Sequence, residues 1–371
     1  MGENEIRNRR GFIGKLLVFV LTLLALVGLF AMVLSVVNPY IDPNRFIWTS
    51  VFGLAFWPIF LFNVFILFLL VLLWSKKAWI SVLALLIAVP GLRRSFSIGD
   101  QSEAIGSIRV MTYNVHDFRH TVEEMEKEEF ANQLIGIVRE QNPDLLCCQE
   151  FSAFKKKVTR SQCIQDFADA VGFQYVYYNK KRNYGGNVVF SKYPIEKVED
   201  DSGFAQENTY GVMVSVDAGD KGKFYLANVH LLSYRITDNE IDILVSPSER
   251  QMVLDTIGKS LLHKLGYAFK LRSEEMAQMM EGLPANGSPV LVCGDFNEPP
   301  MSYNYRQMQK AGYVDTFTKA GRGIKSTYAG KLPLLRIDYI WANDRVTPLC
   351  FKRNRIKASD HYPIVLDFKI Q

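Results

Sequence analysis

The stretch Val290-Leu-Val-Cys-Gly-Asp-Phe-Asn297 decides how this sequence is interpreted. It opens with a short apolar run rich in β-branched residues, which predicts a buried strand. Gly294, Asp295 and Asn297 stand where that strand should end. Because alternate residues of an extended chain project to the same side, we expect the side chains of Asp295 and Asn297 to point the same way. Burying a carboxylate and a carboxamide there is costly unless both are used. The non-functional alternative is a strand followed by an Asx turn.

Polar residues end several other predicted strands as well: Asn114, Glu150, Asn228 with His230, Asp338, and Asp360 with His361. Each one alone has a structural explanation, such as a turn cap, a solvated strand end or an ion pair. Together they supply what metal-assisted phosphoester hydrolysis needs. Hard oxygen ligands suit Mg²⁺, an acid can take a proton from water, and donors can stabilise charge on phosphate oxygens.

Hydrophobic periodicity predicts more strands than helices in the part of the chain after residue 106. Two strand-rich halves flank one long helix, which favours two packed sheets with helices outside. We expect strands over 108–115, 144–150, 175–179, 187–191, 210–216, 223–229, 289–292, 335–341, 351–355 and 364–368, and helices over 123–140, 164–171, 246–280 and 303–311.

The first 94 residues have the composition of a membrane anchor. Apolar runs over 12–37 and 46–74 are long enough to span a bilayer, and the run over 78–92 is short for a span. A cleaved signal peptide is disfavoured because the first run is too long and no small-residue cleavage site follows it. We therefore predict two to three transmembrane helices over residues 1–94, a polar linker over 95–106 and a catalytic domain over 107–371.

Topology depends on whether 78–92 crosses the membrane. Basic residues before the first span place the N-terminus in the cytoplasm. Three spans then put the domain outside the cytoplasm, and two spans leave it inside. We favour three spans in an integral protein of a bacterial-type inner or plasma membrane, with the lipid bilayer as a partner of the N-terminal helices.

Composition after the anchor is that of a soluble domain. A formal net charge of +5 is mild and does not by itself indicate nucleic-acid binding. The five cysteines show no metal-ligand or disulfide spacing. Cys147, Cys148 and Cys293 lie in apolar runs, which is typical of buried free thiols.

Six ordered motifs resemble those of the endonuclease/exonuclease/phosphatase family, which includes DNase I-like nucleases and sphingomyelinases. The motifs are Thr-Tyr-Asn114, Gln-Glu150, Asn-Val-His230-Leu, Gly-Asp295-Phe-Asn297, Arg-Ile-Asp338-Tyr-Ile and Ser-Asp360-His361-Tyr-Pro-Ile. The resemblance implies a four-layer α/β sandwich of the DNase I-like fold and phosphoester hydrolysis that depends on Mg²⁺ or Mn²⁺.

The resemblance also implies roles for individual residues. Glu150 would be the main metal ligand, with Asn114 beside it and Asp360 as a second acid near the metal. Asp295 would activate water, and Asn297 would orient the phosphate. The remaining implied catalytic residues are His230, Asp338 and His361. Asp338 would support His361, and His361 would contact the phosphate.

Two positions distinguish this chain within the family that it resembles. His230 stands where nucleases of DNase I type and sphingomyelinases carry His and abasic-site endonucleases carry Tyr, which disfavours an abasic-site endonuclease. His116 stands where some members carry an acid, which puts a second metal site there in doubt.

The substrate stays open between nucleic acid and a phospholipid headgroup, and no obligate protein partner is implied. The alternative from another class is a catalytically silent membrane scaffold that uses the fold for binding. Residues 233–270 form either a lid at the active-site mouth or an ordinary packed helix. The cluster Lys180-Lys-Arg182 either meets phosphate or is solvated.

Overall fold

The computed structural model describes residues 3–99, 101–102, 104–119, 125–179, 185–198, 211–234, 250–285, 287–330, 334–356 and 358–371. The chain divides into two compact units. The first comprises Met1–Arg94 with Met301–Tyr303, and the second Ser95–Pro300 with Asn304–Gln371. The cluster at 180–182 and the central part of the expected lid, 235–249, lie outside the described residues.

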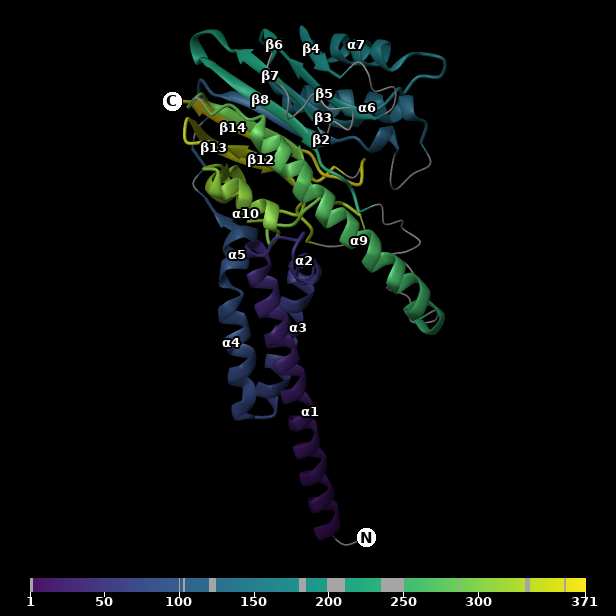
Figure 1. Cartoon of the computed structure of the whole chain (residues 1–371), viewed down its shortest axis with the longest axis vertical. Coiled ribbons are helices and arrows are strands. Elements are labelled where there is room, and N and C mark those ends of the chain that lie inside the picture. The colour runs from purple at the N-terminus through teal and green to yellow at the C-terminus, as the bar shows by residue number, and fades with distance from the viewer. Residues whose placement is uncertain are drawn as a thin grey trace. The chain divides into compact units, whose positions relative to one another are not determined.

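Within the first unit, helices α1 (Glu3–Val37), α3 (Phe56–Leu72) and α4 (Trp79–Ile87) run side by side (Figure 1). The segment Gly11–Tyr40 is long and apolar enough to cross a membrane. Two bent pairs raise the number of candidate spans among the described residues to three. The first pair joins α2 (Trp48–Leu54) to α3 at 68°, and the second joins Lys76–Ile87 to α5 (Val89–Ser95) at 44°.

The apolar runs over 46–74 and 78–92 thus form bent helix pairs, each of which is a candidate span if the pair is counted as one. A proline ring clashes with the carbonyl four residues before it and lacks an amide donor. Pro58 and Pro90 each stand just after one of the two bends. In the same unit, Asn63 is fully buried and donates from Nδ2 to the Gly28 carbonyl at 3.1 Å. This is the kind of polar tie beside a small residue that joins membrane helices.

The second unit begins with a strand rather than with a free linker. Strand β1 (Phe96–Ile98) pairs antiparallel with β11 (Arg322–Ile324). The expected linker over 95–106 is thus corrected at its start. This pairing is hard to predict, because strands only three residues long show no alternation of apolar and polar residues that can be recognised.

Two six-stranded sheets form the centre of this unit. The order in the first sheet is β13 (Val346–Arg353), β14 (Ile364–Ile370), β2 (Ile108–Asn114), β3 (Leu145–Phe151), β5 (Gly186–Ser191) and β4 (Tyr175–Tyr178). The order in the second sheet is β10 (Val314–Asp315), β12 (Asp338–Ala342), β9 (Val290–Asp295), β8 (Lys223–His230), β7 (Gly211–Asp217) and β6 (Ile195–Lys197).

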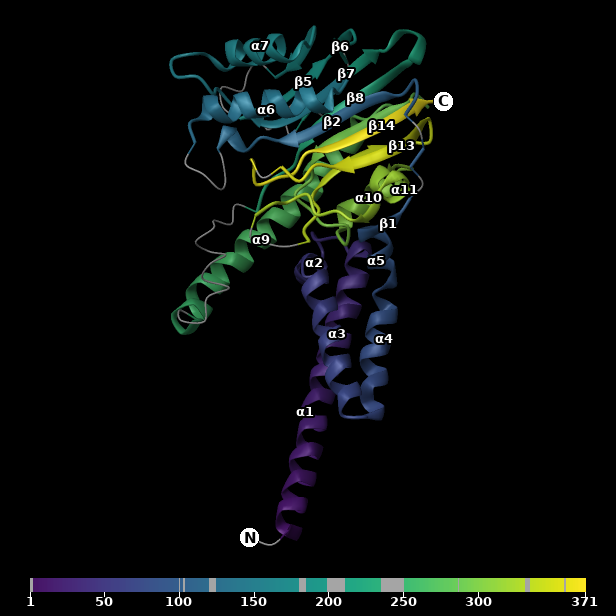
Figure 2. The same cartoon turned by 180° about the vertical axis from the view of Figure 1, so that it is seen from behind.

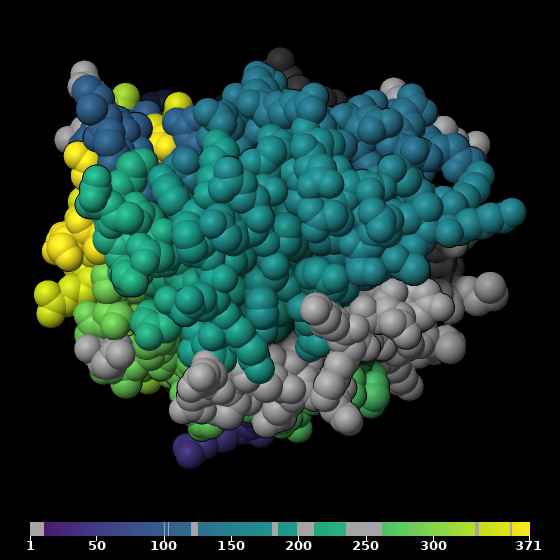
Figure 3. Space-filling model, turned by 90° about the horizontal axis from the view of Figure 1, so that it is seen from above, coloured from purple at the N-terminus to yellow at the C-terminus, as the bar shows by residue number. Residues whose placement is uncertain are grey.

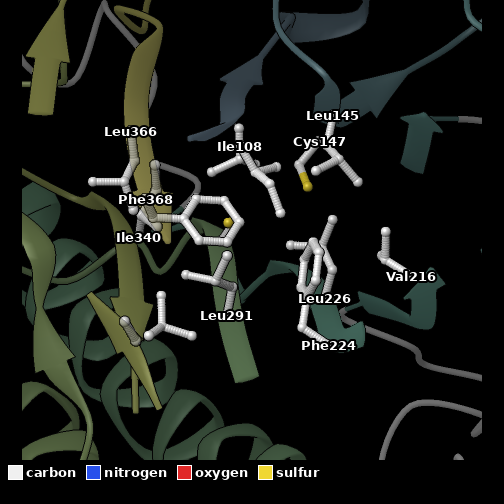
Figure 4. Close-up of a cluster of buried hydrophobic side chains, with 14 of the residues drawn as sticks. Ile108, Leu145, Cys147, Val216, Phe224, Leu226, Leu291, Ile340, Leu366 and Phe368 are labelled. Atoms are coloured by element: carbon white, nitrogen blue, oxygen red, sulfur yellow. The ribbon is translucent and has the colours of Figure 1, made fainter. Parts of the chain in front are cut away.

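The inner faces of the two sheets form the main core. Ile108, Leu145 and Cys147 of the first sheet face Leu226 and Leu291 of the second in a cluster of buried side chains (Figure 4). The alternation of apolar residues along each strand produces this arrangement, because every second side chain points inward. All five cysteines are free and buried, in agreement with the expectation for the three that the sequence singled out.

Helices cover the outer faces, which completes the predicted four-layer α/β sandwich. Helices α6 (Lys127–Gln141) and α7 (Arg160–Val171) pack on the first sheet, and α9 (Arg250–Glu281) and α10 (Tyr303–Lys310) pack on the second. Helix α9 lies in front of the strands in Figure 1 and behind them in Figure 2. The face in Figure 3 is formed mainly by the teal segment that holds α7 and β4–β8.

Two boundaries differ from the expectations. Asp338 begins β12 instead of lying within a strand over 335–341.

The basic stretch of the expected lid, 259–270, lies inside α9, where Leu265 and Phe269 are buried and Tyr267 is 59 % exposed. The described part of 233–270 therefore agrees with the packed-helix alternative. The minor elements are α11 (Thr316–Ala320) and the short turns Asn38–Tyr40, Lys76–Ala78, His116–Phe118 and Gly219–Lys221.

A buried polar tie joins the two sheets. Asn228 of β8 is fully buried and donates from Nδ2 to the carbonyls of Cys148 and Val188, each at 2.9 Å. Its Oδ1 accepts a hydrogen bond from Gln149 Nε2 at 2.7 Å. Asn228 precedes His230 by two residues, and Gln149 precedes Glu150. The tie therefore fixes the two sheets against each other where the candidate catalytic residues emerge.

We predict that Asn228→Ala lowers the free energy of unfolding by about 2–4 kcal/mol, because it leaves several buried polar groups unpaired. Hydrogen–deuterium exchange of β8 peptides across a urea series, on the detergent-solubilised chain, measures this. The matched control is Gln165→Ala on the exposed face of α7, which should change the value by less than about 0.5 kcal/mol. Equal effects of the two substitutions would contradict the structural role of Asn228.

Candidate active site

Strand register brings the predicted residues together at one end of the sandwich. In the second sheet, Asp295 is opposite His230 of parallel strand β8 and opposite Asp338 of antiparallel strand β12. In the first sheet, Asn114 is opposite Gln149, the residue before Glu150. Polar residues that are far apart in the sequence thus end neighbouring strands at the same edge.

The glycine of the central motif is required by a close approach of two strands. Gly294 has φ +140°, and a Cβ there would lie 1.9 Å from the carbonyl oxygen of Val229. Any larger residue would push β9 away from β8 and would displace the pair formed by Asp295 and His230.

A β-bulge presents Glu150. The pairing of β3 with β5 shifts register between Cys148 and Phe151. Glu150 itself has φ 53°, in the left-handed region that non-glycine residues seldom adopt. The bulge redirects one side chain out of the regular alternation. The Glu150 carboxylate therefore reaches the strand end with about a quarter of its side chain exposed.

A second strained turn follows Asn114. His116, Asp117 and Phe118 have φ values of 47°, 52° and 58°, so three successive residues are left-handed. Phe118 is fully buried and its ring packs on Phe151 with the ring centroids 4.8 Å apart. Packing of Phe118 offsets the strain of this turn, which is the kind of local strain that is found at functional sites.

The Asp295 carboxylate lies at the centre of the site and is 1 % exposed. Asn114 Nδ2 donates to Asp295 Oδ2 at 3.0 Å and to Glu150 Oε1 at 3.1 Å. His361 Nε2 lies 3.5 Å from Asp295 Oδ2, and His230 Nε2 lies 3.8 Å from the same oxygen. His230 Nε2 also lies 3.6 Å from Glu150 Oε1 and is buried without a hydrogen-bond partner among the described residues.

Burial raises the pKa of Asp295 to about 6, since the charged carboxylate loses its hydration. The positive charge of His361 acts in the opposite direction, the negative charge of Asp338 adds to the increase, and His230 opposes it more weakly. An aspartate with this pKa is ionised at neutral pH and still accepts a proton readily.

His361 is held as a cation by a buried pair. Its Nδ1 lies 2.9 Å from Asp338 Oδ2 and 3.1 Å from Oδ1. Burial alone would lower the pKa of His361, but the negative charges of Asp338, Asp295 and Asp360 outweigh burial and raise this pKa well above 6.5. The backbone amide of Asp338 donates to Thr327 Oγ1 at 3.0 Å, which fixes the start of β12.

Asn297 does not continue the extended strand, so the expected parallel projection of Asp295 and Asn297 is wrong. Its φ is 51°, and its amide donates to Asp295 Oδ1 at 2.8 Å. The Asx turn offered as the alternative is therefore present, and it serves the site by orienting Asp295. The Asn297 side chain donates to the Leu231 carbonyl at 2.9 Å.

Asp360 lies beside the left-handed turn. Its Oδ1 is 3.7 Å from His116 Nδ1 and 3.2 Å from Ser359 Oγ. Ser359 Oγ also donates to the Asn114 carbonyl at 2.8 Å, which joins the loop before β14 to the end of β2. Ser359 and Thr327 were missed by the sequence analysis, because a hydroxyl that positions a neighbour gives no distinctive pattern.

The donor set fits a hard divalent cation at Glu150. This carboxylate is partly exposed and accepts one described hydrogen bond, from Asn114, so oxygen lone pairs remain for a cation. Asn114 uses its Oδ1 to accept from the amide of His116 at 3.0 Å. Asp295, Asp338 and His361 could also surround an ion, with ligand atoms within 4.8 Å of one another. That group is already paired internally, so we favour Glu150 as the metal ligand.

Several known proteins are similar to this chain. "Uncharacterized protein YbhP" of Escherichia coli (strain K12) is 26 % identical over 287 residues, covering 71 % of this chain and 97 % of that protein. The human Nocturnin catalytic domain with bound sulfate anion has a TM-score of 0.50 at 19 % identity. The similarity covers 71 % of this chain and 95 % of that chain. An endonuclease/exonuclease/phosphatase from Bacteroides vulgatus has a TM-score of 0.49 at 13 % identity. The similarity covers 71 % of this chain and 99 % of that chain.

We predict that Asp338→Asn lowers the pKa of His361, since it removes the nearest negative charge. The chain has five histidines, so NMR titration of ¹⁵N-histidine-labelled protein resolves them. The matched control is Asp367→Asn, which weakens the ion pair of this buried aspartate with the half-buried Arg109 and should leave the pKa of His361 unchanged. A His361 that titrates near pH 6.5 in the wild type would refute the ion pair.

Profiles of sequence families assign both parts of the chain. A domain of unknown function matches residues 15–95. The profile of the Endonuclease/Exonuclease/phosphatase family matches residues 111–361, which is more than half of the chain. Members of that family are phosphoester-hydrolysing enzymes, and dependence on a divalent metal is general among them. This chain therefore belongs to the endonuclease/exonuclease/phosphatase family and is a hydrolase that acts on phosphoester bonds.

Proposed function

We propose that this protein is a membrane-anchored, divalent-metal-dependent phosphodiesterase or phosphatase whose water nucleophile is activated by Asp295. The observation that carries the proposal is the burial of Asp295 between Asn114 and His361, with a pKa raised to about 6 by that burial. Its substrate is nucleic acid or the headgroup of a phospholipid, and the catalytic domain lies outside the cytoplasm.

Asp295 can take the proton of the attacking water. The amide of Asn297 holds one oxygen of its carboxylate at 2.8 Å, and Asn114 Nδ2 holds the other at 3.0 Å. A general base needs this fixed geometry and a pKa somewhat below the working pH. Both conditions are met near neutral pH, where the carboxylate is ionised.

His361 can stabilise charge that develops on the phosphate oxygens. Asp338 holds Nδ1, so Nε2 carries the proton that faces Asp295 and the reaction site. A preorganised donor of this kind is worth more in a buried site than in water. His230 offers a second ring nitrogen within 4 Å of Glu150 and Asp295.

The metal proposed for this site is Mg²⁺ or Mn²⁺, held by Glu150 with Asn114 and Asp360 as further ligands. Asn114 Oδ1 accepts one hydrogen bond, from the His116 amide, and an amide oxygen has a second lone pair for a cation. Bound there, the metal would neutralise phosphate charge and act as a Lewis acid. The alternative of a silent scaffold is disfavoured, because the chain keeps the acids and histidines that hydrolysis would need.

We predict that Asp295→Asn and His361→Ala each lower kcat/KM by at least about a hundredfold, as expected for the loss of a general base or a preorganised donor. Detergent-solubilised protein is assayed with supercoiled DNA, sphingomyelin, glycerophospholipids and inositol phosphates, with Mg²⁺ or EDTA. The control is Asp166→Asn, a half-buried residue of α7 paired with Lys155, which should keep full activity. Metal-dependent turnover that survives both active-site substitutions would contradict the assignment of the base.

The side of the membrane is tested separately. Three spans with a cytoplasmic N-terminus place residues 107–371 outside, so protease added to intact spheroplasts should degrade them. The positive-inside rule carries this expectation. The internal control is a cytoplasmic protein of the same cells, which must stay intact. A domain that is cleaved only after lysis would reverse the proposed topology.

A further inference from the structure

Two segments beside the active site carry only positive charge. The sequence 321–335 contains Arg322, Lys325 and Lys331 but no acidic residue. The sequence 351–359 contains Lys352, Arg353, Arg355 and Lys357 and again no acidic residue. The first segment leads into β12 and Asp338, and the second leads into Asp360 and His361.

Backbone hydrogen bonds join these two segments at the catalytic loop. Tyr328 pairs antiparallel with His361. The amide of Tyr362 donates to the Thr327 carbonyl at 2.6 Å, and the amide of Ala329 donates to the Asp360 carbonyl at 2.7 Å. Lys325 therefore lies three residues along the chain from the partner of His361.

Arg353 connects the same segments through its side chain. Its Nη1 donates to the carbonyl of Ser326 at 2.6 Å and to Ser326 Oγ at 3.1 Å. Its guanidinium carbon lies 5.1 Å from the ring centre of Tyr362, the residue after His361. Arg353 thus contacts both the residue after Lys325 and the residue after His361.

The cations in this cluster repel one another. Burial lowers the pKa of Lys325, and the positive charges of Arg353 and Arg355 lower it further. Burial and Arg355 likewise lower the pKa of Arg353. Among the described residues, Lys325 and Arg355 have no ion pair with a carboxylate. Three positive charges held close together repel one another, which costs free energy. A bound anion would remove this cost.

Hydrogen-bond donors in the cluster also lack acceptors. Arg353 Nε and Asn354 Nδ2 are buried and have no partner among the described residues. An unpaired buried donor is costly, and a phosphate supplies several acceptor oxygens at once. Positive charge and unpaired donors thus indicate the same kind of ligand.

We propose that Lys325, Arg353 and Arg355 form a subsite for a second phosphate of the substrate, next to the phosphoester that is hydrolysed. This inference rests on the proposed hydrolase function and narrows its substrate class. The preferred substrate carries at least two phosphates, either as a neighbouring nucleotide or as a phosphorylated headgroup. A substrate with one phosphate and a cationic headgroup, such as sphingomyelin, is disfavoured.

The test compares matched substrates that differ by one phosphate. The nucleotide arm uses the dinucleotide TpT and its 5′-phosphorylated form pTpT. The lipid arm uses vesicles with phosphatidylinositol or phosphatidylinositol 4-phosphate. Bis(4-nitrophenyl) phosphate reports hydrolysis without a second phosphate. We expect the added phosphate to lower KM about tenfold or more in one arm. That arm shows whether the second phosphate belongs to a nucleotide or to a lipid headgroup.

In the double variant Lys325→Ala, Arg355→Ala, the added phosphate should no longer lower KM. Arg353 is kept because it also holds Ser326 and Tyr362. The double variant should unfold at the same temperature as the wild type or higher, because repulsion is relieved. The matched control is Lys369→Ala, which changes an exposed lysine at the far end of β14. In this variant the added phosphate should still lower KM as in the wild type.

Each outcome separates this inference from the proposed function. If no substrate is hydrolysed in a metal-dependent way, the proposed hydrolase fails and the subsite fails with it. If hydrolysis occurs but the added phosphate does not lower KM in either arm, the subsite alone is refuted. A gain that persists in the double variant also refutes it, since the cations named here would not be its source.

Discussion

The second unit depends on the burial of one carboxylate where two sheets meet. Asp295 ends a strand of the second sheet, and Asn114 of the first sheet donates to it at 3.0 Å. A buried charge without partners would cost several kcal/mol, so the surroundings must supply donors and a counter-charge. His361, Asn297 and Asn114 supply them, and Asp338, Thr327 and Ser359 in turn hold those donors in place.

The same constraint explains features of the fold that would otherwise be defects. Three such features surround the Asp295 carboxylate. Gly294, with φ +140°, precedes Asp295 in the chain. The bulge at Glu150 and the three left-handed residues after Asn114 are joined to it through Asn114, which donates to both Glu150 and Asp295. Each costs stability locally and each directs a polar group to the site. The apolar core between the sheets and the Asn228 tie offset that cost and keep the strand ends in register.

Sequence reasoning reached the residues of the site because their types and order are distinctive. Asn114, Glu150, His230, Asp295, Asp338 and His361 do converge, and the sandwich has the expected layers. It missed what depends on backbone geometry. The left-handed φ of Asn297 and the bends beside the two prolines of the apolar helices need three-dimensional context. It also found no long basic stretch, because the cations near Lys325 and Arg353 come from two segments that only the fold brings together.

The pH dependence of kcat/KM for bis(4-nitrophenyl) phosphate decides whether Asp295 is the base. We predict that kcat/KM rises with pH through an apparent pKa of about 6, as Asp295 loses its proton. It should fall again only at a pH well above 6.5, where His361 loses its proton. A profile that is flat from about pH 4.5 to 7.5, or the same rising limb in the residual activity of Asp295→Asn, would contradict the assignment of Asp295 as the base.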